Sequence, residues 1–310
     1  MILCVSLNPA VDRMLHLGAE LKPGAVNRIS EQRDYAGGKG VNVARVLKEL
    51  DADPTLTGFA GGDGGELIAR TLSSEGIGSA LVRTEAPTRC NQNFISPDGT
   101  VTELLAPGPK ITERERERFL EEFSDILPKS RLLLLSGSLP PGIPAGFYAQ
   151  LIREARAAGV PAFLDSSGEA LREGVAARPF LIKPNRAELE ALCGEACPSR
   201  DAALYGAELL KERYALPCVA LSLGAEGLLY LFENERLFAA APELDAVSTV
   251  GCGDAALASL AHSYLAGLDA RESLKWAVAR SAAAALEEES GHIDTARAEE
   301  LADRVQIYTV

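Results

Sequence analysis

The stretch Ser248-Thr249-Val250-Gly251-Cys252-Gly253-Asp254 leads directly into a helical pattern over Ala255–Leu268. Glycines at a helix start let the backbone approach a ligand, and the free N–H groups there can form a nest for a phosphoryl group. Asp254 falls in the first turn, where a carboxylate is favourable even without any chemistry. The stretch therefore predicts either a capped helix start or an anion site with an acid beside it.

Away from this stretch, short apolar runs alternate with longer helical patterns. The expected strands are Ile2–Leu7, Arg131–Ser136, Pro161–Asp165, Phe180–Lys183, Cys218–Leu223 and Leu228–Phe232. The other expected helices are Val41–Leu50, Phe147–Ala158, Arg186–Cys193 and Ser273–Glu289. This alternation indicates parallel βαβ units in a three-layer α/β/α sandwich with a mostly parallel central sheet. Because no long linker interrupts it, residues 1–310 are expected to form a single domain.

Two extended segments break this rhythm, at about residues 12–36 and 89–105. Both alternate without an intervening helix, so we expect them to pair into a small antiparallel sheet outside the main one. Open α/β sheets bind ligands at the carboxyl ends of their strands. The small sheet is therefore predicted to be a lid over a site at that edge.

Composition excludes several classes of function. The formal net charge of -13 and the pI of about 4.9 argue against nucleic acid as a partner, because phosphate backbones need a basic footprint. No apolar run approaches the ~20 residues that span a bilayer, and the first residues lack the charged region of a signal peptide. The six cysteines form no C-x-x-C pair and no zinc pattern. They are expected to be reduced thiols of a cytoplasmic protein.

A second glycine motif, Gly37-Gly38-Lys39-Gly40-Val41-Asn42-Val43-Ala44, also begins a helix. Lys39 and Asn42 lie near the helix start, where they can contact an anionic or hydroxylated ligand. The motif is not a P-loop, which requires G-x-x-x-x-G-K-[ST]. The alternative is a tight turn with an ordinary surface lysine.

Three further segments follow expected strands. In Lys183-Pro184-Asn185-Arg186-Ala187-Glu188, an amide and a carboxylate three residues apart suit a Mg²⁺ site that works through waters, or a capping box. Ser222-Leu223-Gly224-Ala225-Glu226-Gly227 is a hairpin turn or a turn that approaches a nucleotide. Ser136-Gly137-Ser138-Leu139-Pro140-Pro141-Gly142 is a rigid polar loop where a ligand would lie. Each of the last two is weak evidence alone.

Taken together and in this order, the five motifs resemble the PfkB branch of the ribokinase-like carbohydrate kinases over essentially the whole chain. The opening Ser6-Leu7-Asn8-Pro9-Ala10-Val11-Asp12 and Val26-Asn27-Arg28 are similar to the subgroup of 1-phosphofructokinases and tagatose-6-phosphate kinases. The resemblance implies ATP-dependent phosphorylation of a ketohexose phosphate, with Mg²⁺ as the metal. It also implies a lid that makes a homodimer contact in many relatives.

The resemblance assigns roles to individual residues. The sugar hydroxyls would be held by Asp12, Gly38, Lys39 and Asn42, with Ser138 close to the substrate. The substrate phosphate would face Arg28, Lys39 and Arg89. The nucleotide and Mg²⁺ side would be lined by Lys183, Asn185, Glu188, Ser222, Gly224 and Gly227, with Asn185 and Glu188 at the metal. Gly251, Cys252 and Gly253 would form the anion hole, and Asp254 would be the catalytic base.

Two departures from the family pattern bear on the expected chemistry. Cys252 stands where relatives mostly carry alanine, which places a thiol beside the anion hole, where a lowered pKa would make it reactive. Ser248-Thr249 stands where kinases of neutral sugars often have Asp-Thr, which favours a phosphorylated substrate. The sequence does not separate fructose 1-phosphate from tagatose 6-phosphate or fructose 6-phosphate.

Three other functions compete with this interpretation. Arg28 and Arg89 disfavour a ribokinase-like kinase for an unphosphorylated sugar or nucleoside. The intact Asp254 and Glu188 disfavour a non-catalytic sugar-phosphate sensor. A Rossmann dehydrogenase is disfavoured because no G-x-G-x-x-G follows the first strand with an acidic residue ~20 positions later. The preferred prediction is conversion of fructose 1-phosphate to fructose 1,6-bisphosphate.

Overall fold

A ten-stranded sheet forms the middle layer of the computed structural model, which describes residues 1–310. Its strands are β1 (Ile2–Ser6), β4 (Pro54–Ala60), β5 (Gly78–Arg83), β8 (Leu132–Ser136), β9 (Ala162–Asp165), β10 (Leu181–Ile182), β11 (Cys218–Ser222), β12 (Gly227–Phe232), β13 (Glu235–Ala240) and β14 (Gln306–Thr309). They lie in the order β14-β13-β12-β11-β10-β9-β8-β1-β4-β5. From β11 to β5 every pair is parallel, so these strands end at the same edge.

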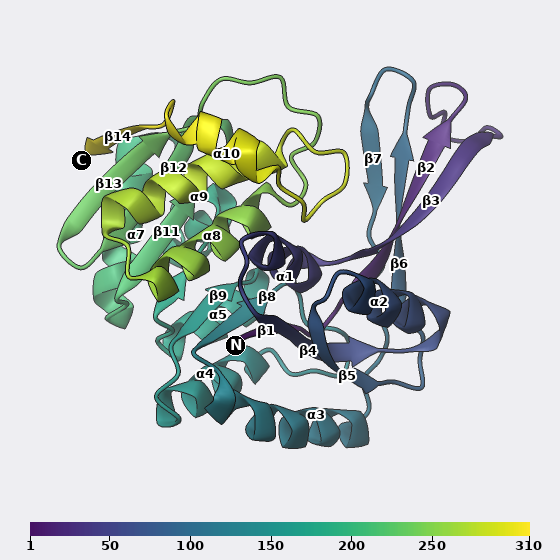
Figure 1. Ribbon diagram of the computed structural model, residues 1–310, viewed down its shortest axis with the longest axis horizontal. Coiled ribbons are helices and arrows are strands. Elements are labelled where there is room, and N and C mark those ends of the chain that lie inside the picture. Colours follow the sequence, from purple (N-terminus) through teal and green to yellow (C-terminus); the bar gives the residue numbers. More distant parts are fainter.

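Helices cover both faces of this sheet (Figure 1). One face carries α1 (Lys39–Glu49), α2 (Gly62–Ser74), α8 (Cys252–Ala266), α9 (Ala270–Ala284) and α10 (Thr295–Ala302). The other carries α3 (Glu113–Ile126), α4 (Phe147–Ala157), α5 (Gly168–Ala176), α6 (Arg186–Cys193) and α7 (Arg200–Tyr214). No helix is both long and apolar enough to cross a membrane.

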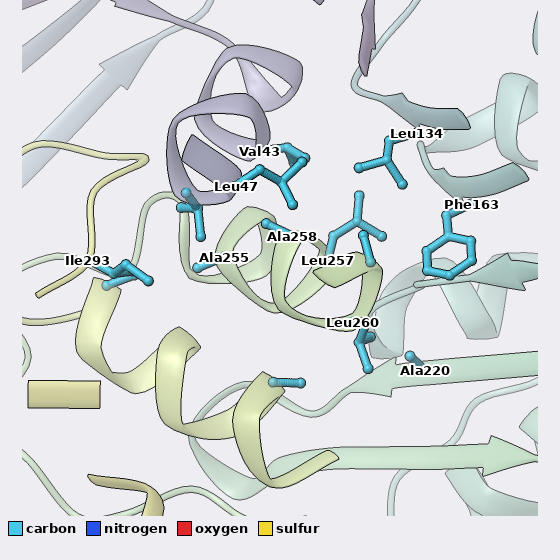
Figure 2. Packing of buried hydrophobic residues seen from close by; sticks show 14 of the residues in the cluster. Val43, Leu47, Leu134, Phe163, Ala220, Ala255, Leu257, Ala258, Leu260 and Ile293 are labelled. Carbon is cyan, nitrogen blue, oxygen red and sulfur yellow. The ribbon is translucent and has the colours of Figure 1, made fainter. Parts of the chain in front are cut away.

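The alternation of side chains along the central strands explains the two cores. On β8, Leu132 and Leu134 join the cluster under α1 and α8, whereas Leu133 and Leu135 join the cluster on the opposite face. A strand that is buried on both faces must be apolar at every position. Figure 2 shows the first cluster, where side chains of α8 lie between α1 and the sheet.

The small sheet projects from the main body (Figure 1) and consists of β2 (Ala10–Leu17), β3 (Ile29–Gly37), β6 (Arg89–Ile95) and β7 (Val101–Leu104). Its order is β3-β2-β6-β7. The two outer pairs are antiparallel, but the central pair of β2 and β6 is parallel. The expectation of a purely antiparallel sheet is therefore wrong. Both central strands enter from the main body, one after β1 and one after β5, and so they run in the same direction.

One expected helix has different bounds in the structure. The pattern over Ser273–Glu289 predicts a helix that reaches Glu289, but α9 begins at Ala270 and ends at Ala284. The carbonyl of Ala285 accepts hydrogen bonds from the N–H groups of Val247 and Ser248, and the chain then turns away. Residues 285–294 form a loop instead, and this loop lies beside the site described next.

Candidate active site

The start of α8 places Asp254 at the carboxyl edge of the main sheet. Gly251 is the N-cap residue with φ +86°, a conformation that glycine adopts without strain. Asp254 follows in the first turn and is 4% exposed. The first N–H groups of a helix have no intrahelical partner, so the Gly251–Asp254 segment offers donors next to a buried carboxylate.

The start of α1 faces the same place. Gly38 is its N-cap residue with φ +99°. One turn into the helix, Asn42 donates a hydrogen bond from Nδ2 to Oδ2 of Asp254 at 2.8 Å. Gly37 has no room for a side chain, because a Cβ there would lie 1.8 Å from Oδ2 of Asp12. The turn at Gly37 and Gly38, which precedes α1, therefore has the Asp12 carboxylate packed against it and the Asn42 amide following it in the helix.

Asp165 lies between two lysines at this edge, and it is absent from the residues predicted from the sequence. Its carboxylate is 1% exposed and lies 3.0 Å from Nζ of Lys39 and 3.0 Å from Nζ of Lys183. Lys183 also approaches Gly253, since a Cβ there would lie 3.2 Å from its Nζ. Asp165 is the last residue of β9. A carboxylate at the end of a parallel strand was a signal that could have identified it.

The surrounding charges set the protonation of the two acids differently. Burial raises the pKa of Asp254 to about 6, with Asp165 adding to the rise and Lys39, Asn42 and Lys183 opposing it. Burial also raises the pKa of Asp165, but Lys183 and Lys39 outweigh it, so that the net pKa is lowered. At neutral pH Asp254 is therefore an ionised carboxylate whose pKa suits a general base.

The residues predicted for the sugar lie at the root of the small sheet. Asp12 on β2 accepts a hydrogen bond from Nδ2 of Asn91 at 2.7 Å. Arg89 on β6 donates from Nη2 to the carbonyl of Asn8 at 2.9 Å. Asn8 in turn donates from Nδ2 to Oγ of Ser138 at 3.1 Å. The structure thus joins Asp12, Arg89 and Ser138 in one group, to which it adds Asn8 and Asn91.

Arg28 is the exception among the predicted sugar-side residues. It is exposed at the far end of the β2–β3 hairpin, where its carbonyl accepts from the N–H of Gly18. Asp12 pairs with Tyr35 near the opposite end of that hairpin. Leu17 pairs with Ile29, the residue after Arg28. A strand rises ~3.4 Å per residue, so the five steps from Asp12 to Leu17 separate these two residues by about 17 Å. Within one chain, the structure does not bring Arg28 to Arg89 and Lys39.

The predicted metal residues form a capping box at the start of α6. Oδ1 of Asn185 accepts from the N–H of Glu188, and Oε2 of Glu188 accepts from the N–H of Asn185, both at 2.9 Å. Burial lowers the pKa of Lys39, but Asp165, Asp254 and, with the smallest effect, Glu188 outweigh it, so that the net pKa is raised. Oε1 of Glu188 and the Asn185 amide are hard oxygen donors, which fit a Mg²⁺ held mainly by waters and phosphates. No group of three or more acidic, His or Cys side chains gathers anywhere as a dedicated metal cage.

The predicted nucleotide turn lies next to these residues. Ser222 ends β11 and forms an isolated bridge with Asn185. Gly224 has φ +62° and nothing within 4 Å of a Cβ position, so a ligand can approach it. Gly227 is fixed by packing instead, because a Cβ there would lie 2.0 Å from the carbonyl oxygen of Ala239. The turn is thus both a hairpin turn and an open approach to the site.

The Cys252 thiol differs from its sequence-based expectation. Burial and the neighbouring Asp254 raise its pKa to about 11, whereas a reactive thiol needs a lowered pKa. The helix N-terminus does not compensate, because the charge that acts on the thiol is that of the Asp254 carboxylate. We therefore expect iodoacetamide to alkylate Cys252 slowly at pH 7, and Cys252→Ala to retain kcat. Rapid labelling at pH 7, followed by mass spectrometry, would show that the thiol is activated after all.

Comparisons with known proteins show what the sequence and the fold of this chain are similar to. The sequence profile described as pfkB family carbohydrate kinase matches residues 5–296. The 1-phosphofructokinase of Vibrio cholerae is 34% identical over 307 residues, which cover 99% of this chain and 96% of the relative. The tagatose-6-phosphate kinase of Staphylococcus epidermidis is 33% identical over 313 residues, and the match covers 100% of both chains. The tetrameric inhibited form of phosphofructokinase-2 from Escherichia coli superposes with a TM-score of 0.90, at 28% identity and 98% coverage of each chain.

These matches define the class of protein as a carbohydrate kinase. The chain belongs to the PfkB family of carbohydrate kinases. The predicted ribokinase-like fold and the predicted enzyme class, a phosphotransferase with an alcohol group as acceptor, are thereby confirmed.

Proposed function

We propose that this enzyme transfers the γ-phosphoryl group of ATP to a hydroxyl of fructose 1-phosphate and so forms fructose 1,6-bisphosphate. The observation that carries the proposal is the buried Asp254 carboxylate beside the free N–H groups of the α8 start, with Asn42 as its hydrogen-bond partner. The basic side chain of Arg89 at the sugar side favours a phosphorylated substrate. The 1-phosphofructokinase relatives support the choice of sugar phosphate.

In the proposed mechanism the protein mainly positions the reacting groups and stabilises the charge on the transferring phosphoryl group. Asp254 accepts the proton of the attacking hydroxyl, while Asn42 fixes the orientation of the carboxylate. The N–H groups of Gly251–Asp254, and the Lys183 ammonium beside Gly253, would stabilise the negative charge that develops on the transferring group. Asp165 pairs with both Lys39 and Lys183 and so fixes the positions of their ammonium groups.

The nucleotide side follows from the same placement. The open backbone at Gly224 and the Ser222–Asn185 bridge would line the ATP site, with Lys183 near the phosphates. Glu188 and Asn185 would hold Mg²⁺ through waters, and the ion would offset phosphate charge when bound. A hollow of about 320 Å³ lies between Val101 and Glu103 on β7 and residues 246–250, which precede the proposed anion hole. The small sheet therefore borders the site, where it would act as a lid that excludes water.

Arg89→Ala tests the phosphate-binding role. Hydrogen bonds to charged groups contribute about 1.5–3 kcal/mol, so the KM for the sugar phosphate should rise at least about tenfold while the KM for ATP stays within about twofold. Arg13→Ala is the matched control, because Arg13 lies on the same sheet but pairs with Asp34 in solvent. Steady-state kinetics that show an unchanged sugar KM in Arg89→Ala would remove Arg89 from the phosphate site.

Substrate identity is tested by a coupled ADP-release assay over fructose 1-phosphate, tagatose 6-phosphate, fructose 6-phosphate, free hexoses, ribose and nucleosides. We expect the highest kcat/KM with fructose 1-phosphate. A higher value with tagatose 6-phosphate would favour the second candidate function, which the Staphylococcus epidermidis relative supports. A preference for an unphosphorylated acceptor would contradict both.

We also propose a homodimer that forms through the small sheet in the cytoplasm. Apolar side chains at its tip and edge are exposed, namely Val26, Ile29, Leu104 and Leu105 at 85%, 50%, 56% and 66%. Such a patch on a projecting sheet is typical of an interface. All six cysteines are free, which suits a reducing compartment. Light scattering should give twice the chain mass for the wild type and a monomer for Leu104→Lys, whereas a monomeric wild type would contradict the dimer.

A further inference from the structure

The loop between α9 and α10 lies against both glycine-rich helix starts. Gly291 has φ +84°, and a Cβ there would lie 2.7 Å from Cα and 2.8 Å from Oδ1 of Asn42. On the other side, a Cβ on Gly251 would lie 3.1 Å from the Gly291 nitrogen and 3.2 Å from Cβ of Ser290. The backbone of this loop therefore fits between Asn42, which bonds to the proposed base, and Gly251 of the proposed anion hole.

One carboxylate attaches this loop to α1. Glu49 is the last residue of α1, and its Oε1 lies 2.7 Å from Nδ1 of His292. Its Oε2 accepts a hydrogen bond from the N–H of Ile293 at 2.8 Å. The Ile293 side chain is 6% exposed and belongs to the cluster around Leu47 and Ala255 in Figure 2. Both oxygens of a single side chain thus hold two successive residues of the loop, directly after Gly291.

A second acid of the loop reaches the same helix. Oε1 of Glu289 lies 3.7 Å from Nη1 of Arg45 and 3.6 Å from Nε2 of His292. Arg45 is 2% exposed and is itself fixed by the carbonyl of Ala36 at 2.8 Å and by Glu75 at 3.0 Å. Asn42, Arg45 and Glu49 are spaced three and four residues apart, so they share one face of α1.

We propose that the Glu49–His292 pair is a positioning device for catalysis, which holds the 289–293 loop so that Gly291 keeps Asn42 and Gly251 in place around Asp254. The inference rests on the proposed function, because it assigns a role through the proposed base and anion hole. Neither residue touches the reacting groups. Their effect passes through the backbone of Gly291, which packs so closely against Asn42 that even a Cβ would not fit between them.

The charge state of the pair gives this role a signature. The groups that face His292 are Glu49 and Glu289, with Arg45 and Glu75 behind them. Hydrogen bonds to Glu289 and Glu49 raise the pKa of His292 to about 9. The ordinary value is about 6.5, so the ion pair is fully present below that pH and is lost as the pH rises through about 9.

The test combines histidine NMR with pH profiles of kcat. The chain has only 3 histidines, so the His292 imidazole signal can be assigned by its loss in His292→Asn. We expect the signal to titrate near pH 9 in the wild type and at least about one pH unit lower in Glu49→Gln. The alkaline limb of kcat should move down with it. At pH 8, kcat of Glu49→Gln should be about tenfold below the wild type, with both KM values within about twofold, since small misplacements of catalytic groups act on turnover.

Glu113→Gln is the control, because Glu113 forms an exposed pair with Arg116 on α3, on the opposite face of the sheet from α1. It should leave both the titration and the pH profile unchanged. Thermal unfolding at pH 8 establishes that Glu49→Gln is folded at the assay temperature, and His292→Asn provides a second route if it is not. A shifted imidazole titration with an unshifted kcat limb would overturn the inference while leaving an active kinase. A wild type without sugar-dependent turnover would overturn the proposed function itself.

Discussion

Asp254→Asn is expected to lower kcat by about 10²–10⁴-fold, with a smaller change in either KM. The substitution keeps the shape of the side chain but removes the group that accepts the hydroxyl proton. Because Asp254 is 4% exposed, bulk water cannot easily replace it as the base. Single-turnover measurement of ADP formation isolates the chemical step from product release.

Asp63→Asn is the matched control for this experiment. Asp63 also lies in the first turn of a helix that begins with glycine, α2, but it is exposed. If Asp254 only capped its helix, both variants would lose about 0.3–1 kcal/mol of stability and neither would lose turnover. A near-normal kcat in Asp254→Asn would exclude it as the base.

The pH dependence of kcat/KM gives an independent view of the same group. A base must be deprotonated, and the pKa of Asp254 is raised to about 6 by burial. We therefore expect kcat/KM to be level above that pH and to fall about tenfold per pH unit below it. An acid limb centred near pH 4, the ordinary range of an aspartate, would show that the buried environment does not operate in solution.

Asp165→Asn is expected to destabilise the fold by about 3–5 kcal/mol, because it leaves the Lys183 ammonium buried without its partner. Lys183 is 5% exposed, whereas the Lys39 side chain is 41% exposed and can recruit water. Urea unfolding at pH 7 measures the change. The carboxylate has a lowered pKa, so its contribution is complete at neutral pH and is lost only as the pH falls through that lowered value.

Two further variants separate the buried pair from a general effect of charge. Asp34→Asn removes a carboxylate that pairs with Arg13 on the surface at 2.7 Å, and it should cost no more than about 1 kcal/mol. Lys183→Met in the Asp165→Asn background should recover part of the lost stability, since no unpaired ammonium then remains buried, and that of Lys39 is open to water. A loss below about 1 kcal/mol in Asp165→Asn would mean that Lys183 finds another partner.

The fold was largely predictable because its central strands are buried on both faces. Runs such as Leu132–Leu135 leave no other interpretation than an interior strand or helix, and the turn residues around them set their length. The end of α9 was not predictable in the same way. Residues 282–286 are alanine and leucine without glycine or proline, and tertiary hydrogen bonds to Ala285 end the helix instead.

The site was predictable where a backbone requirement left its mark on the sequence. The glycines at 37, 38 and 251 are demanded by close approaches or positive φ, and they point to Asp12, Asn42 and Asp254. Asp165 carries no such mark, because its role depends on two lysines that are distant in the chain. The raised pKa of Cys252 depends on burial, which one sequence does not show.

Arg28 illustrates a third limit. The resemblance to the family groups it with Arg89 and Lys39, but a residue near a hairpin turn can be far from the base of its own sheet. Strand register, which the sequence alone leaves open, separates Leu17 and Ile29 at the tip from Asp12 and Tyr35. The role of Arg28 at the substrate phosphate therefore stays a prediction, because Arg28 does not lie near Arg89 and Lys39 within one chain.

The proposed reaction is tested most directly by following phosphoryl transfer by ³¹P NMR in one tube containing the wild type, ATP, Mg²⁺ and fructose 1-phosphate. We expect the γ-phosphate signal to be replaced stoichiometrically by a second sugar-phosphate signal, that of fructose 1,6-bisphosphate. Inorganic phosphate should stay at the level of a sample without enzyme, and Asp254→Asn should abolish the change on the same timescale. Release of inorganic phosphate without a new sugar phosphate, or equal turnover by Asp254→Asn, would contradict the proposed reaction and its base.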